Sequence, residues 1–127
     1  MDKSSGPRKN MFRFQDLDIW KKAIDIGERL FDIADELEAK RLYRFADQIR
    51  GAGLSISNNI AEGAGSLSKK EFANFLNIAK RSAFENANMA IVFAKRGLIS
   101  AEAMEDLLTN LEQECRMITG FIKSLKR

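Results

Sequence analysis

The chain has 127 residues, of which 45% are hydrophobic and 31% are charged, the proportions of one soluble globular domain rather than of a disordered chain. It contains no histidine and a single cysteine, which excludes imidazole bases, His-ligated metal sites and an intramolecular disulfide. The net charge is only +3, but residues 16–38 carry three basic and eight acidic side chains, so the remainder of the chain is basic.

The N-terminal residues 1–12 are polar and basic, and we predict that they form a flexible tail ahead of a helical domain spanning residues 13–127. They contain no hydrophobic segment, so the sequence predicts no secretory signal peptide. No apolar run approaches the roughly 18 residues that a membrane span requires. We therefore expect a cytoplasmic protein without a membrane partner.

The first predicted helix spans residues 16–39, with Asp16 as its candidate N-cap. Its apolar residues form two adjacent seams, Leu17, Trp20, Ile24, Gly27, Phe31 and Ala34 in one and Ile19, Ala23, Ile26, Leu30, Ile33 and Leu37 in the other. Two seams make a face wider than one partner helix covers, so this helix should pack against at least two neighbours. We expect the surplus apolar seam, together with the acidic charge of this helix, to promote self-association.

The second predicted helix spans residues 41–62 and has the apolar stripe Leu42, Phe45, Ile49, Ala52, Ile56 and Ile60. It contains Gly51 and Gly53, which are unfavourable in a helix interior unless another helix approaches closely. Gly63 and Gly65 follow, and we expect them to end the helix in the left-handed conformation.

The third helix is predicted to begin after Ser68, which forms a capping box with Glu71, and to end at Gly97. The fourth begins after the N-cap Ser100 and has the seam Met104, Leu108, Leu111, Cys115, Ile118, Ile122 and Leu125, in which Cys115 is expected to be a buried core thiol. Four helices with short connections predict an all-α, antiparallel up-down-up-down four-helix bundle.

The residues that could carry catalysis show no catalytic pattern. Di-iron bundles need Glu-x-x-His pairs, which a chain without histidine cannot supply, and Glu62, Glu71 and Glu85 lack the spacing of a carboxylate metal site. Gly63 and Gly65 lack the lysine and the preceding strand of a phosphate-binding loop. The sequence predicts a protein that is not an enzyme, with no catalytic residues, no metal and no cofactor.

Two polar stripes interrupt the apolar pattern of the second and third helices. They consist of Ser55, Asn59 and Glu62 on the second helix and Ser82, Glu85 and Asn86 on the third. The first interpretation is an interior hydrogen-bonded network that sets the register of the two helices. The alternatives are a pocket for a ligand or a partner, and exposure to solvent.

Residues 40–96 carry ten basic and four acidic side chains, and clustered Lys and Arg residues on one face are typical of phosphate binding. The candidate nucleic-acid contacts are Arg41, Arg44, Arg50, Lys69, Lys70, Lys80 and Arg81. Alternatively, these charges form a solvated face, or they pair with the acidic first helix of a neighbouring subunit in a head-to-tail contact that closes as a ring.

Three blocks of sequence carry a family resemblance: FQDLDIWKKA at residues 14–23, SISNNIAEGAG at 55–65, and KKEF and FLNIA at 69–72 and 75–79. Together they resemble the bacterial 23S rRNA intervening-sequence proteins, and the chain is similar to the accessory protein of diversity-generating retroelements. The resemblance implies a cytoplasmic four-helix bundle, often a homo-pentameric ring, and the retroelement protein binds nucleic acid and a reverse transcriptase. The chain departs from the family pattern at Ser57, Ser66 and Arg81, where proline, arginine and glycine are common.

The sequence therefore predicts a non-enzymatic, self-associating four-helix bundle that binds structured RNA or DNA through a basic surface. Its expected partners are copies of itself in a pentameric ring, RNA or DNA, and a nucleic-acid-processing protein. The alternative is a protein–protein interaction scaffold whose charges serve subunit assembly.

Overall fold

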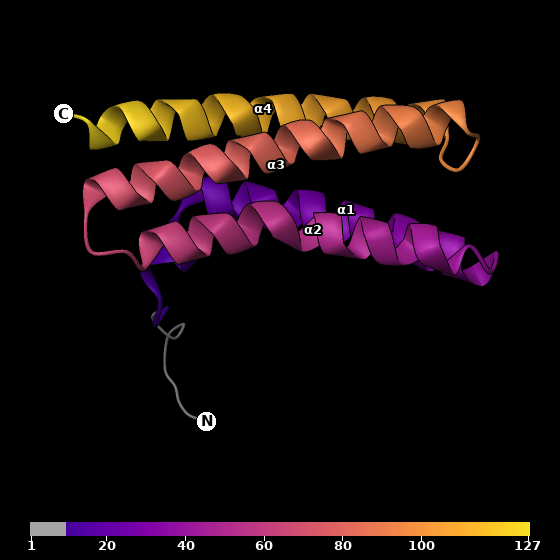
Figure 1. Cartoon of the computed structure of the whole chain (residues 1–127), viewed down its shortest axis with the longest axis horizontal. Helices are drawn as coiled ribbons and strands as arrows, with labels where there is room; N and C mark the ends of the chain where they lie inside the picture. The colour runs from indigo at the N-terminus through magenta and orange to yellow at the C-terminus, as the bar shows by residue number, and fades with distance from the viewer. Residues whose placement is uncertain (1–9) are drawn as a thin grey trace, which may run out of the picture.

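The computed structural model describes residues 10–127 and contains a 3-10 turn followed by four long helices. These are η1 (Arg13–Asp16), α1 (Asp18–Ala39), α2 (Tyr43–Ala64), α3 (Lys69–Lys95) and α4 (Ala101–Leu125). Figure 1 shows α1 and α2 in one layer and α3 and α4 in the other, with successive helices running in opposite directions. This confirms the predicted antiparallel four-helix bundle. Of the predicted tail, residues 1–9 lie outside the described residues.

The helix ends agree with the sequence where a serine side chain makes the cap. The Ser68 hydroxyl accepts a hydrogen bond from the Glu71 amide at 3.1 Å, and the Ser100 hydroxyl accepts one from the Ala103 amide at 3.0 Å. The predicted N-cap at Asp16 is wrong, because Asp16 ends η1 and its carboxylate accepts a hydrogen bond from the Asn10 amide group at 2.8 Å.

The turn between α1 and α2 explains why α2 begins later than predicted. Arg41 has a φ of 64°, in the left-handed region that L residues rarely occupy. The amide of Leu42 then donates to the Leu37 carbonyl at 2.9 Å, closing the turn behind α1. Arg41 therefore belongs to the connection and not to the helix.

The apolar residues of α1 pack against two neighbouring helices, as predicted. Helix α1 packs mainly on α2 and to a smaller extent on α4, and η1 adds a contact between Phe14 and Trp20, whose ring centroids are 5.3 Å apart. Every large apolar side chain of α1 is buried or half-buried. The seam that contains Trp20 and Phe31 keeps its large side chains only half-buried, so the use of a surplus apolar seam for self-association stays a prediction.

Helices α1 and α2 approach each other most closely at two glycines. A Cβ atom on Gly27 would lie 2.5 Å from the carbonyl oxygen of Gly53, and a Cβ on Gly53 would lie 2.9 Å from the Phe31 ring. The predicted close approach is therefore confirmed for Gly53. It is wrong for Gly51, where an added Cβ would meet no atom within 4 Å.

The glycines near the end of α2 serve packing rather than termination. Gly63 lies inside the helix, and a Cβ there would lie 2.7 Å from the Phe75 Cβ of α3. Gly65 caps the helix with a φ of −86°, so the left-handed conformation predicted for this pair is wrong. That conformation occurs instead at Gly97, which follows α3 with a φ of 74°.

The buried seam of α4 is rotated relative to the predicted one. Its fully buried residues are Leu107, Leu111, Glu114 and Ile118. Leu111 and Ile118 belong to the predicted seam, whereas Cys115 and the remaining members are only half-buried. Burial raises the pKa of the Cys115 thiol above its ordinary value, and Cys115 lines a groove between α3 and α4 instead of filling the core.

Candidate nucleic-acid interface

Arg50, one of the predicted phosphate contacts, has its side chain against acidic residues of α1. Its guanidinium donates to the Asp35 carboxylate at 2.9 Å and to the Glu38 carboxylate at 2.7 Å, both on α1. The hydrogen bond to Asp35, followed by that to Glu38, raises the pKa of Arg50. Two carboxylates of α1 therefore already surround the charge of Arg50, which forms an ion pair between α2 and α1.

The remaining predicted cations lie in separate groups along the bundle. Arg41 and Arg44 are exposed where α2 begins, whereas Lys69 and Lys70 are exposed where α3 begins. Figure 1 shows that these starts lie at opposite ends of the bundle. A helix of the length of α2 is about 33 Å long, so the predicted basic residues do not form one patch.

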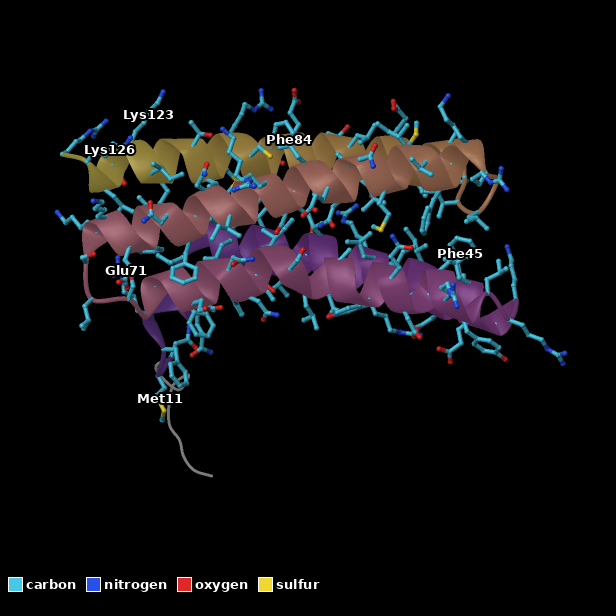
Figure 2. All side chains as sticks on the ribbon, viewed as in Figure 1. Met11, Phe45, Glu71, Phe84, Lys123 and Lys126 are labelled. Carbon is cyan, nitrogen blue, oxygen red and sulfur yellow. The ribbon has the colours of Figure 1, made fainter. Side chains whose placement is uncertain are left out.

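Lys69 and Lys70 lie beside the C-terminal end of α4. They line a groove with Asn74, Asn77 and Lys126, which is closed on the α4 side by Ile122 and Leu125. Figure 2 shows Lys123 and Lys126 together on this end of α4. Sequence reasoning did not include these two lysines in the candidate interface, because only the antiparallel packing of α3 and α4 brings them beside Lys69 and Lys70.

Lys80 and Arg81 extend this basic surface along α3. They line the next groove with Ile78, Phe84 and Glu85, and Asn77 belongs to both grooves. From Lys69 to Arg81, α3 advances about 18 Å, roughly the length of five nucleotides in one strand of a duplex. We call the cations of this surface the basic strip: Lys69, Lys70, Lys80, Arg81, Lys123 and Lys126.

Among the described hydrogen bonds, none joins a side chain of one predicted polar stripe directly to a side chain of the other. Buried Asn86 of α3 donates from its side-chain amide to the Ala52 carbonyl of α2 at 3.3 Å. The Asn59 side chain donates within α2 to the Ser55 carbonyl at 2.8 Å, and the Ser55 hydroxyl donates within α2 to the Ala52 carbonyl at 2.9 Å.

The interior placement predicted for these stripes holds for some of their members only. Ser82 is buried like Asn86, and Ser55 and Asn59 are half-buried, but Glu62 and Glu85 are exposed. The predicted interior network is therefore wrong for the two glutamates. The helical rotation turns both carboxylates outward, where water solvates the charges.

Glu114 is one of two buried polar residues that sequence reasoning did not place in the core, the other being Ser57. Its side chain is 0% exposed, and neither carboxylate oxygen has a hydrogen-bond partner. Burial raises the pKa of Glu114 to about 8, against the opposing influence of the Lys22 charge on α1. The signal was present in the sequence, since Glu114 follows Leu107 and Leu111 and precedes Ile118 at helical spacing.

Polar contacts beside Glu114 connect α1 to α4. The Lys22 ammonium donates to the Asn110 side-chain oxygen at 2.5 Å, and Arg29 forms an ion pair with Asp106. The hydrogen bond to Asp106 is the main cause of the raised pKa of Arg29. Within residues 10–127, no group of three or more Cys, Asp or Glu side chains is placed to hold a metal ion, and no helix there is long and apolar enough to cross a membrane.

Comparisons with known proteins agree on the fold of the chain. The profile of the 23S rRNA-intervening sequence protein family matches residues 15–120. The chain is similar to a crystal structure of a protein of unknown function from the S23 ribosomal protein family of Bacteroides thetaiotaomicron, with a TM-score of 0.76 and 24% identity over 83% of this chain and 98% of that chain. The comparison with curated protein sequences yields no match.

Proposed function

The chain belongs to the 23S rRNA-intervening sequence protein family, and on this premise we propose that it is a non-enzymatic, self-associating four-helix bundle that binds structured RNA or DNA through the basic strip. We propose the cytoplasm as its location and the pentameric ring implied by the family resemblance as its assembly. In this proposal the bundle acts as a binding module, and no covalent chemistry is assigned to it.

The clustering of six cations along α3 and the end of α4 is the observation that carries the proposal. Lys69, Lys70 and Lys126 line one continuous groove, and Asn77 connects it to Lys80 and Arg81. Lysine and arginine side chains displace condensed counterions when they bind phosphates, which is the main source of affinity for nucleic acid. The neighbouring asparagines add amide groups that can donate to phosphate or base oxygens.

Replacing Lys69 and Lys70 with glutamine should weaken binding to a labelled RNA hairpin at least tenfold at about 100 mM salt. The physical reason is the loss of two phosphate contacts, which should also reduce the salt slope of the association constant by about two. Fluorescence anisotropy over a salt series from about 50 to 200 mM measures both quantities.

The matched control replaces Arg41 and Arg44 with glutamine, an equal change of charge at the opposite end of the bundle. This control should keep most of the affinity. Equal losses in the two double variants would show that only total charge matters and would refute the basic strip. Wild-type protein that does not bind the hairpin even at about 50 mM salt would favour the alternative function, a protein–protein interaction scaffold whose charges serve assembly.

A further inference from the structure

Phe84 is the most exposed aromatic side chain among residues 10–127, with an exposed fraction of 64%. It lies near the middle of α3, on the outer layer that α3 and α4 form (Figure 2). A single exposed apolar side chain is common on protein surfaces, so what Phe84 can bind depends on the chemistry of the groups around it.

On α3, the basic strip ends immediately beside Phe84. Lys80 and Arg81 precede Phe84 by four and three positions, and residues at this spacing share one face of a helix with Cβ atoms about 5–6 Å apart. The three side chains also line one groove. The next cation along α3 is Lys95, about three helical turns beyond Phe84. A nucleic-acid backbone that follows the basic strip along α3 therefore reaches its last cations just before the Phe84 ring.

Amide side chains lie on the other side of the ring. Asn88 follows Phe84 by one helical turn, and Gln48 of α2 lines the same groove as both of them. The two amides are exposed. Each offers a hydrogen-bond donor and an acceptor, the combination that pairs with the edge of a nucleobase. Phe84 thus lies between groups that suit a phosphate and groups that suit the edge of a base.

Carboxylates around Phe84 determine which part of a nucleotide can lie on its ring. Glu85 lines two of the grooves beside Phe84, and Glu105 and Glu112 of α4 line a third. These negative charges repel a phosphate group. They do not repel a neutral base, and a carboxylate can accept a hydrogen bond from the amino group of cytosine. The backbone should therefore stay on the cations of the basic strip while a base lies over Phe84.

We infer that Phe84 is a stacking platform for an unpaired base of the nucleic acid whose backbone binds the basic strip. Bases inside a duplex stack on one another, so only a base in a loop, a bulge or a single-stranded end can present its face to an aromatic ring. Lys80 and Arg81 contact the phosphate of this nucleotide. Asn88 and Gln48 lie on the side of its base edge. The inference rests on the proposed nucleic-acid binding, and it specifies the ligand as one with unpaired nucleotides.

Replacing Phe84 with leucine should weaken binding to a labelled RNA hairpin with an unpaired loop about tenfold, as expected for the loss of one base–aromatic stack. Binding to a blunt duplex of the same stem sequence should stay unchanged, because the duplex offers no free base. The salt slope should also stay unchanged, since leucine removes no phosphate contact. Phe84→Trp keeps an aromatic ring and should bind the hairpin like the wild type. Fluorescence anisotropy over a salt series measures all of these quantities.

Tyr43→Leu is the matched control for Phe84→Leu. Tyr43 is an aromatic side chain with an exposed fraction of 58%, and it too has cations beside it, Arg41 and Arg44, but it lies outside the basic strip. Tyr43→Leu should therefore bind both RNAs like the wild type. Far-ultraviolet circular dichroism verifies that every variant is folded.

The other outcomes separate the stacking platform from the proposed function. Wild-type protein that binds neither RNA would refute the proposed function and the platform together. Hairpin binding that is weakened by the glutamine variant of Lys69 and Lys70 but not by Phe84→Leu would refute the platform alone. Equal losses for hairpin and duplex would overturn the contact with an unpaired base. A lower sedimentation mass for Phe84→Leu than for wild type would show that a second copy of the chain covers Phe84, which would also overturn the inference.

Discussion

Replacing Glu114 with leucine should raise the free energy of unfolding at pH 7 by about 3 kcal/mol. The folded protein holds Glu114 as a neutral acid with a pKa of about 8, against an ordinary value of 4.5. Each pH unit between these values changes stability by about 1.4 kcal/mol. Leucine removes this dependence and also removes two buried oxygens that have no hydrogen-bond partner, an arrangement that is unfavourable in a protein interior.

The stability difference between wild type and Glu114→Leu should also depend on pH, which tests the same prediction a second time. Below about pH 4.5 the carboxyl is neutral in both the folded and the unfolded chain, so its ionisation makes no contribution to the free energy of unfolding. As the pH rises towards 8, the unfolded chain ionises while the folded chain retains its proton, and the wild type loses stability relative to Glu114→Leu. Above pH 8 the difference should level off, because both states are then ionised.

Urea denaturation of wild type and Glu114→Leu at pH 5, 7 and 9 measures both effects. The control is Glu112→Leu, because the Glu112 side chain is 72% exposed on the same helix and its replacement should leave the difference from wild type nearly constant with pH. A difference between wild type and Glu114→Leu that does not grow from pH 5 to pH 7 would contradict the buried neutral carboxyl.

Replacing Gly27 with alanine should lower the free energy of unfolding by up to about 2 kcal/mol. The new Cβ would lie 2.5 Å from the Gly53 carbonyl oxygen, a backbone atom that can move only if α1 and α2 separate. Overpacking of this kind costs about 1–3 kcal/mol, more than the gain of about 1 kcal/mol that alanine brings to an exposed helix interior. Urea denaturation at one fixed protein concentration measures the change.

The same substitution at Gly120 is the matched control for Gly27→Ala. Gly120 lies inside α4, and an added Cβ would meet no atom within 4 Å. Gly120→Ala should therefore stabilise the protein by about 1 kcal/mol through helix propensity alone. Two variants of identical chemistry thus have opposite expected signs, and stabilisation by Gly27→Ala would contradict the close approach of α1 and α2.

The sequence by itself determined the number, the order and the approximate ends of the helices. Apolar residues at intervals of three and four fall on one side of a helix, and the serine caps at Ser68 and Ser100 are local, since each bond joins residues three apart. Features set by neighbouring residues along one helix can be read without knowing what packs against it. The family resemblance and the bundle fold follow from the same local patterns.

Only the tertiary structure decided which side of α4 faces inward and which charges meet. On α4 the predicted seam with Leu108 and Cys115 lies beside another of similar spacing with Leu107 and Glu114. The packing of α4 against α3 and α1 buries the second of these seams. The basic strip combines Lys69 with Lys126, which are 57 positions apart in the sequence. Burial, pKa shifts and the grouping of charges depend on distances between helices, and a periodic pattern within one helix contains no information about those distances.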